Sequence, residues 1–140
     1  MQLRWAAVAA VVLSVVSGTG WAADQGKEKG AEAAALKWLA LVDNGQYGDS
    51  WNQASEVFRK AISREQWEQA VQQVRTPLGK LVSRKLTSAT YTTKLPGAPE
   101  GEYVVLQFST GYENKKEAIE TITPMLEKDG VWRVSGYFVK

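Results

Sequence analysis

The stretch Ser63–Lys94, SREQWEQAVQQVRTPLGKLVSRKLTSATYTTK, changes its hydrophobic period and so divides the chain into a helical half and a strand half. Its first four residues match the S-x-x-Q capping box, in which the side chains of Ser63 and Gln66 each accept a bond from the other's backbone amide. Apolar residues then recur at helical spacing and predict a buried stripe of Trp67, Ala70, Val71 and Val74, until Pro77 and Gly79 end the pattern. From Lys80 onward, a period near two and many Thr, Val and Tyr residues predict a strand.

Two further helices are predicted before Ser63. Ala31–Asp43 is rich in good helix formers and ends at Asn44-Gly45, because glycine tolerates the left-handed conformation that terminates helices. The second helix covers about Tyr47–Ile62, with Asp49 as its N-cap. We expect one apolar stripe on each helix to face a shared core.

Three more strands follow Lys94, separated by turn signals. The loop Leu95–Gly101 holds two prolines and two glycines and cannot continue a ladder. Asp129-Gly130 is a hairpin signal before the last strand, in which Trp132, Val134 and Phe138 are predicted to share one face. The four predicted strands are Lys80–Lys94, Glu102–Tyr112, Lys116–Lys128 and Val131–Val139.

This order of elements predicts an α+β fold. We expect three N-terminal helices packed on a curved, cone-like four-stranded antiparallel sheet. The chain of 140 residues is too short for two separate cores, so residues 31–140 are predicted to form a single domain. Residues 23–30 are polar and glycine-bearing, and we expect them to form a flexible leader.

The N-terminus has the pattern of a secretory signal peptide. Arg4 precedes the apolar run Ala6–Val16, and small residues lead to Ala22, after which we expect cleavage. Glycines interrupt the run too early for a spanning helix, which needs about 20 apolar residues. We therefore expect residues 1–22 to be removed, leaving an exported protein, periplasmic or secreted, without a membrane span. An uncleaved anchor is the alternative.

The composition excludes several functional classes. The chain has no histidine and no cysteine, which excludes a Ser–His–Asp triad, a Cys–His pair, Cys or His zinc ligation and disulfides. A net charge of +2 is too small for a strong electrostatic hold on nucleic acid or anionic lipid. We expect no metal and no cofactor, since the paired carboxylates Glu117 and Glu120 lack calcium-loop spacing and are interpreted as the solvated face of a strand.

An enzyme built on this sequence would have to rely on carboxylates. Asp43, Asp49 and Glu65 lie nearest to apolar helix stripes, and burial tunes a carboxyl group toward a general base. Each also has a structural interpretation. Asp43 ends a helix, Asp49 caps one, and Glu65 lies in a first helical turn, where negative charge is favourable. We assign no catalytic residue.

Aromatic and basic side chains are the candidates for binding. Tryptophans in amphipathic elements, including Trp132, are predicted to be core, and the alternative is that two or three line the mouth of a pocket for an apolar or sugar-like ligand. A second candidate is a loose basic cluster, interpreted either as an anion-binding surface for glycans or lipid headgroups or as solvated helix and strand edges; its members are Arg75, Lys80, Arg84, Lys85 and Lys94. A tyrosine beside a carboxylate would form a hydroxyl-donor site. The candidate ligand-binding residues are Trp38, Trp51, Trp67, Tyr91, Arg75 and Arg84.

The residues of the mature segment also resemble a known family over about Ala31–Lys140. The resemblance is carried by Trp38-Leu39-x-Leu41-Val42-Asp43-x-Gly45-x-Tyr47, Ser50-Trp51-x-x-Ala54-Ser55, Trp67, Arg75-x-Pro77-Leu78-Gly79, Arg84, Tyr91, Leu95-Pro96-Gly97-x-Pro99-x-Gly101-x-Tyr103 and Asp129-Gly130-x-Trp132-Arg133-Val134-x-Gly136-Tyr137. In combination these look like the domain of unknown function 4019 family.

That resemblance implies a small exported bacterial domain with no assigned activity, and it supplies no catalytic residue to transfer. More distantly, the helix order and the closing Asp-Gly-x-Trp hairpin are similar to the nuclear transport factor 2-like superfamily. The cone-shaped sheet of that superfamily encloses a pocket, which some members use for catalysis and many only for binding. A likeness of fold does not establish a function.

The sequence therefore predicts a noncatalytic binding module for a small ligand or cell-envelope component, with no nucleic-acid partner. One alternative is a dimerising structural or interaction protein of the envelope, in which helices leave Val104, Leu106 and Phe108 of the sheet uncovered. The other alternative is a carboxylate-based enzyme with its active site inside the cone.

Overall fold

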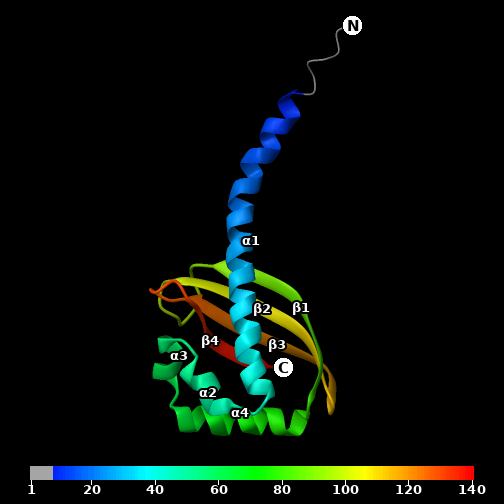
Figure 1. Cartoon of the computed structure of the whole chain (residues 1–140), viewed down its shortest axis with the longest axis vertical. Coiled ribbons are helices and arrows are strands. Elements are labelled where there is room, and N and C mark those ends of the chain that lie inside the picture. The colour runs from blue at the N-terminus through cyan, green and yellow to red at the C-terminus, as the bar shows by residue number, and fades with distance from the viewer. Residues whose placement is uncertain (1–7) are drawn as a thin grey trace.

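The computed structural model describes residues 8–140, with side chains described from residue 23 onward. Within these residues, four helices precede an antiparallel sheet of strand order β1-β2-β3-β4. The predicted α+β class is confirmed, and the sheet is curved but open, with β1 and β4 as its edges (Figure 1). The elements are α1 Val8–Asp43, α2 Tyr47–Asn52, α3 Glu56–Ala61, α4 Arg64–Leu78, β1 Leu81–Thr92, β2 Glu102–Tyr112, β3 Lys115–Leu126 and β4 Trp132–Val139.

The helix predicted over Tyr47–Ile62 is two helices, so the described residues hold four helices and not three. The break occurs at Ser55, whose backbone amide donates to the carbonyl of Val134 on β4, 2.9 Å away. The hydroxyl of Ser55 accepts from the amide of Phe58 and caps α3. A tertiary bond to the sheet therefore interrupts a helical pattern that looks continuous in the sequence. The prediction that Asp49 is the N-cap of this helix is wrong. Asp49 lies in the first turn of α2, and Gln46 occupies the N-cap position.

The capping box of α4 is confirmed. The Ser63 hydroxyl accepts from the Gln66 amide, and the Gln66 side chain accepts from the Ser63 amide. The buried stripe of α4 differs from the predicted one, because Val74 is 45% exposed while Arg75 is buried. The stripe continues from Trp67 and Val71 to a charged residue, for which the interior supplies a partner.

A β-bulge changes which side chains of β4 face the core. Pairing with β3 slips between Thr123 and Pro124, where Val134 and Gly136 are the successive partners. Val134 is therefore buried, but Phe138 is 57% exposed, so the prediction that the two share one face is wrong. Tyr137 takes the inward position instead and packs against the core, since one extra residue reverses the alternation of a strand.

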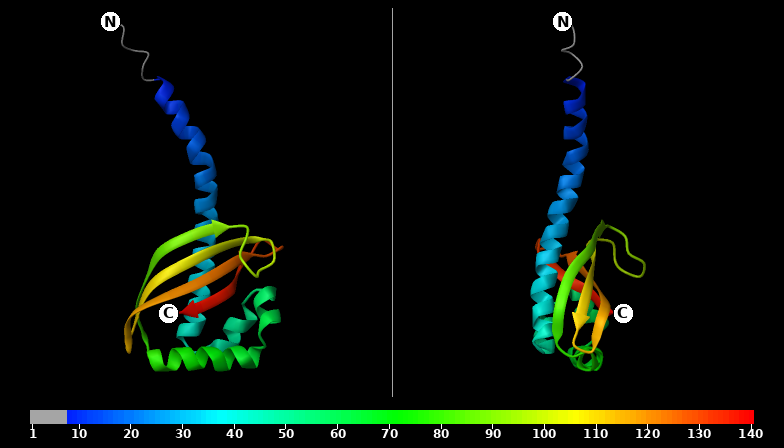
Figure 2. Two further views of the ribbon diagram at one scale, coloured as in Figure 1. Left: turned by 180° about the vertical axis from the view of Figure 1, so that it is seen from behind. Right: turned by 90° about the vertical axis from the view of Figure 1, so that its right-hand side faces the viewer.

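The hydrophobic core lies between α1 and the concave face of the sheet. Figure 2 shows α1 along that face and α4 across one end of the sheet. An aromatic cluster fills the space, with Trp38 5.8 Å from Trp67 and 5.4 Å from Tyr137 between ring centroids. Such tilted and edge contacts add to the stabilisation from apolar burial. The core residues of the sheet include Val104, Leu106, Phe108 and Ile122.

The helix α1 runs continuously through residues 23–30, which the sequence predicts to be a flexible leader. Lys27 of this segment donates to Glu102 on β2 at 2.8 Å. The predicted signal peptide 1–22 lies partly outside the described residues, and its side chains lie wholly outside them, so it stays a prediction. In the part of the chain that the structure describes, no helix combines the length and the hydropathy needed to cross a bilayer.

Candidate functional site

A pocket of about 570 Å³ lies between α1, α2 and the start of β4. One face of α1 supplies residues at helical spacing. Asp49 comes from α2 and Gln53 is the residue that caps its C-terminus, while the β3–β4 turn and β4 supply four residues in a row. Pockets of this volume hold small molecules in many proteins. The lining residues are Ala34, Lys37, Trp38, Leu41, Asp49, Gln53, Val131, Trp132, Arg133 and Val134.

Charged side chains of both signs surround this pocket. Lys37 on α1 and Asp49 on α2 are exposed, and neither forms an ion pair with a described residue. Arg133 on β4 is already paired with Glu127 at 2.7 Å and with Asp129 at 2.9 Å. The lining charges without an ion pair are thus the ammonium of Lys37 and the carboxylate of Asp49, which also accepts a bond of 3.5 Å from the Gln46 side chain.

Trp132 differs from the other described tryptophans in its hydrogen bonding. The indole nitrogens of Trp38, Trp51 and Trp67 donate to the Ser50 carbonyl, the Ile62 carbonyl and the Ser50 hydroxyl respectively. For the half-buried indole N–H of Trp132, no acceptor is found among the described residues. No described residue therefore satisfies this indole N–H.

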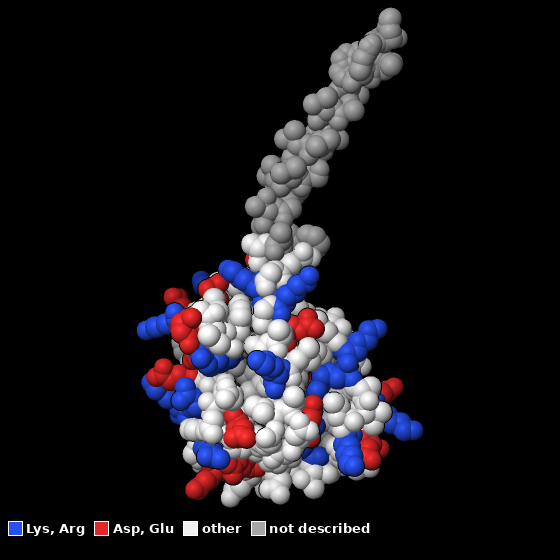
Figure 3. All heavy atoms as spheres, in the orientation of Figure 1, with Lys and Arg blue, Asp and Glu red and all other residues white. Residues whose placement is uncertain are grey.

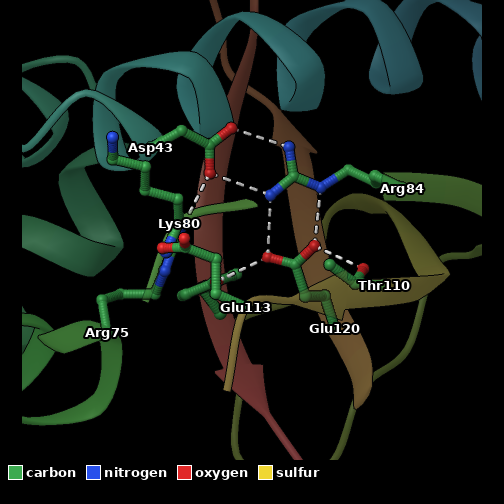
Figure 4. Close-up of polar contacts among 8 residues, drawn as sticks. Asp43, Arg75, Lys80, Arg84, Thr110, Glu113 and Glu120 are labelled. Atoms are coloured by element: carbon green, nitrogen blue, oxygen red, sulfur yellow. Dashed lines mark hydrogen bonds and ion pairs between the residues drawn. The ribbon is translucent and has the colours of Figure 1, made fainter. Parts of the chain in front are cut away.

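Inside the core lies a separate network of charged residues (Figure 4). The guanidinium of Arg84 on β1 contacts two carboxylates with both of its edges. It donates to Asp43, the last residue of α1, at 2.8 and 3.0 Å, and to Glu120 on β3 at 2.6 and 3.1 Å. Bidentate bonds of this kind are among the strongest that proteins form. They also offset the unfavourable position of a carboxylate at a helix C-terminus.

Glu120 is fully buried, so its interpretation as part of a solvated strand face is wrong. Besides the bonds from Arg84, its carboxylate accepts one from the Thr110 hydroxyl at 2.7 Å and one from the Tyr137 hydroxyl at 2.6 Å. Burial alone raises the pKa of a carboxyl group, but the bonds from Arg84 and Tyr137 outweigh it and lower the pKa of Glu120. Glu120 is therefore charged and fully bonded.

The phenols beside Glu120 are held in their neutral form. Burial and the Glu120 charge raise the pKa of Tyr112 to about 12, and the same two causes raise the pKa of Tyr137. A protonated Tyr137 is needed for its hydroxyl to donate to the carboxylate. The network therefore keeps one proton arrangement over the neutral pH range.

Arg75 on α4 completes the network from the opposite side. Its Nη2 donates to Asp43 at 2.8 Å, and its guanidinium carbon lies 5.0 Å from the centroid of the Tyr112 ring. Nε and Nη1 of Arg75 and the Tyr112 hydroxyl are buried without a hydrogen-bond partner among the described residues. The ring partly compensates the guanidinium through a cation–π contact.

The buried network is built for stability more than for chemistry. Two guanidinium groups and two carboxylates cancel in charge, and the members come from α1, α4 and all four strands. Asp43, an enzyme candidate from the sequence, is bonded by two arginines and has no free role as a base. Asp49 and Glu65 are exposed. The carboxylate candidates are thus not brought together.

The structure also separates the predicted binding residues from one another. Trp38 and Trp67 are buried, Trp51 is half-buried, and of these three only Trp38 borders the pocket. The two arginines of the predicted basic cluster, Arg75 and Arg84, point inward and pair with carboxylates, so they form no anion-binding surface. In the sequence, Trp132 stands out only as a tryptophan of an amphipathic strand, and no pattern marks the pocket residues Lys37 and Gln53.

Tyr91 does meet a carboxylate, at another place in the fold. Its hydroxyl donates to Glu102 at 2.8 Å, and Lys27 bonds both groups and lies over the Tyr91 ring. This cluster joins α1 to β1 and β2, and its members bond each other. Among the residues with described side chains, no group of three or more metal-ligating residues could hold a metal ion.

The surface expected to support dimerisation is not exposed. Val104, Leu106 and Phe108 are covered by the helices and belong to the core. On the face seen in Figure 3, positive and negative side chains are interspersed and form no patch of a single sign. That face offers no continuous basic surface.

Comparison with known proteins identifies one family. The model of the family described as "Protein of unknown function (DUF4019)" matches residues 34–137. This range includes the pocket, the buried network and nearly the whole sheet. No curated protein matches the chain.

Proposed function

This chain belongs to the DUF4019 family, whose function is unknown, and we propose that it is an exported, noncatalytic binding domain for a small ligand or a cell-envelope component. The pocket between α1, α2 and β4 is the proposed site. The observation that carries the proposal is the combination in this pocket of apolar walls with the free charges of Lys37 and Asp49.

The contrast with the buried network supports a binding role over a catalytic one. In the network, every carboxylate is bonded by arginine, whereas the carboxylate of Asp49 lies at the open pocket without an ion pair. A general base needs a carboxylate near a reacting atom and without a permanent partner. Asp49 is exposed, and no second carboxylate lines the pocket beside it.

Export of the protein rests on the sequence pattern of residues 1–22. Cell fractionation with mass spectrometry of the N-terminus tests it. We expect the periplasmic or secreted form to begin after Ala22. A cytosolic protein that retains Met1 would contradict export.

Filling the pocket tests the binding role. Ala34 lines the pocket, and Ala33 beside it on α1 is exposed. Ala34→Trp is expected to fill the site, while the matched Ala33→Trp leaves it open. A ligand at 100 times its dissociation constant stabilises the native protein by about 2.7 kcal/mol. A thermal-shift screen with envelope lipids and glycans reads out this gain.

We expect at least one compound to raise the melting temperature of the wild type and of Ala33→Trp but not of Ala34→Trp. If no compound does so, or if the two variants respond alike, the pocket is not the binding site.

Dimerisation is a second candidate function. The surface that favours it is the convex face of the sheet, which exposes large apolar side chains, and not the buried face that the sequence suggested. Phe138 is 57% exposed and Ile119 48% exposed, and both lie beside Thr121 on the convex face of the sheet. Light scattering at high protein concentration tests it. A dimer that Phe138→Ser dissociates would support this role, and a monomer would exclude it.

A further inference from the structure

The charges of the pocket select against a ligand of strong net charge. A ligand anion attracted by Lys37 would be repelled by Asp49, and a ligand cation attracted by Asp49 would be repelled by Lys37. Arg133 adds little to this balance because Glu127 and Asp129 neutralise it. A neutral ligand avoids both penalties.

The polar groups of the pocket select equally against a purely apolar ligand. A hydrocarbon chain that covered Asp49 and Gln53 would remove water from them and return no hydrogen bond. An unpaired polar group costs about 1–3 kcal/mol when it is desolvated. Hydroxyl groups suit this lining, because each donates to a carboxylate and accepts from an ammonium or amide.

Trp132, which lines the pocket, places a third requirement on the ligand. Trp132 lies directly against α1, since a Cβ atom on Gly30 would be only 3.2 Å from its Nε1. The Nε1–Cδ1 edge of the indole therefore lies close to α1 at Gly30, which does not line the pocket, whereas Trp132 itself is a lining residue. A ring that has an apolar C–H face and polar edges suits both the aromatic surface of Trp132 and the polar side chains of the lining.

We infer that the pocket takes a neutral sugar of one or two pyranose rings, with hydroxyl groups bonded to Asp49, Gln53 and Lys37 and with one ring against Trp132. This inference rests on the proposed binding function and names its ligand class. The pocket volume of about 570 Å³ lies in the range that small-molecule sites usually have.

The test uses the purified protein and five probes of known chemistry. Maltose and N,N′-diacetylchitobiose are neutral, glucosamine is cationic, N-acetylneuraminic acid is anionic, and laurate is apolar apart from its headgroup. Binding is followed through the indole N–H resonance of Trp132 in NMR spectra, assigned with the Trp132→Phe variant. We expect a neutral disaccharide to shift this resonance.

Two variants and one control identify the contacts. Asp49→Asn is expected to raise the dissociation constant of the disaccharide about tenfold, because a charge-assisted bond becomes a neutral one. Trp132→Phe keeps an aromatic ring but offers a smaller surface for a sugar ring, and it is expected to raise the dissociation constant about fivefold. Glu65→Gln makes the same change of charge on α4, outside the pocket, and is expected to leave the constant unchanged.

The possible failures are distinguishable. If laurate or a charged probe shifts the Trp132 resonance and neither disaccharide does, the sugar class is wrong and the pocket remains a binding site. If a disaccharide binds with equal affinity to wild type, Asp49→Asn and Trp132→Phe, the inferred contacts are wrong. If the pocket resonances respond neither to these probes nor to the compounds of the wider screen, both the inference and the proposed function fail.

Discussion

Arg84 on β1 bonds Glu120 on β3 across the intervening strand β2, with 2.6 Å between Nε and Oε1. The bond spans the sheet because both side chains point to its concave face, where Thr110 of β2 donates to the same carboxylate. The other edge of the Arg84 guanidinium donates to Asp43 at the end of α1. One guanidinium therefore ties the helical layer to the sheet.

Glu120→Gln is predicted to destabilise the fold by about 3 kcal/mol, because Arg75 and Arg84 then share the single carboxylate of Asp43 and one buried positive charge is uncompensated. Urea denaturation measures the change. Glu117→Gln, an exposed site on the same strand, is the control and is expected to stay within about 0.5 kcal/mol of the wild type. Equal midpoints for the two variants would show that the network contributes nothing to stability.

The stability of the protein is predicted to fall in acid through Glu120. Hydrogen bonds from Arg84 and Tyr137 lower its folded-state pKa below the ordinary value of 4.5, despite the opposing effect of burial. The stabilisation from this group is therefore present above about pH 4.5 and is lost as the pH falls through the folded-state pKa. Urea denaturation at several pH values between 6 and 3 measures the free energy of unfolding. This free energy should fall less with decreasing pH in Glu120→Gln than in the wild type. The same dependence on pH in the variant and the wild type would contradict this prediction.

Ser50→Ala is predicted to cost about 2 kcal/mol. The Ser50 hydroxyl accepts from the Trp67 indole at 2.9 Å and donates to the Tyr47 carbonyl at 2.6 Å. Its removal leaves a buried indole N–H without an acceptor. Thermal unfolding measures the loss. Ser88→Ala, at an exposed position of β1, should cause little change, and a similar loss in both variants would argue against this role.

Two glycines of α1 are predicted to respond differently to alanine. A Cβ atom at Gly26 meets nothing within 4 Å, whereas one at Gly30 lies 3.2 Å from Trp132. Gly26→Ala should stabilise the protein by about 0.5–1 kcal/mol, as expected for a helical site. Gly30→Ala should gain less and should shift the Trp132 indole resonance, which Gly26→Ala leaves in place. Without any gain from Gly26→Ala, residues 23–30 would be a flexible leader in solution.

The local signals of the sequence predicted the elements well where a short segment decides the outcome. The capping box at Ser63 and the Asp129-Gly130 turn act through neighbouring residues, and both α4 and the β3–β4 hairpin form where expected. The division of Tyr47–Ile62 at Ser55 was not predictable in this way, because it depends on a bond to Val134 far along the chain.

The candidate site was less predictable for the same reason. Arg75 and Arg84 were identified as binding residues and Glu120 as a surface group, yet the fold joins them through Asp43. Tyr137 reaches Glu120 only because a bulge in β4 reverses the alternation of the strand. A bulge and a buried ion pair leave no periodic signal in the sequence.

Local sequence by itself determined the helix and strand types, the main turns and the functional classes that need histidine or cysteine, because each follows from nearby residues or from composition. Only the tertiary structure decided that Asp43, Arg75, Arg84 and Glu120 form one neutral cluster and that Lys37, Asp49 and Trp132 border one pocket. These residues are far apart along the chain, and their proximity depends on how α1 packs across all four strands.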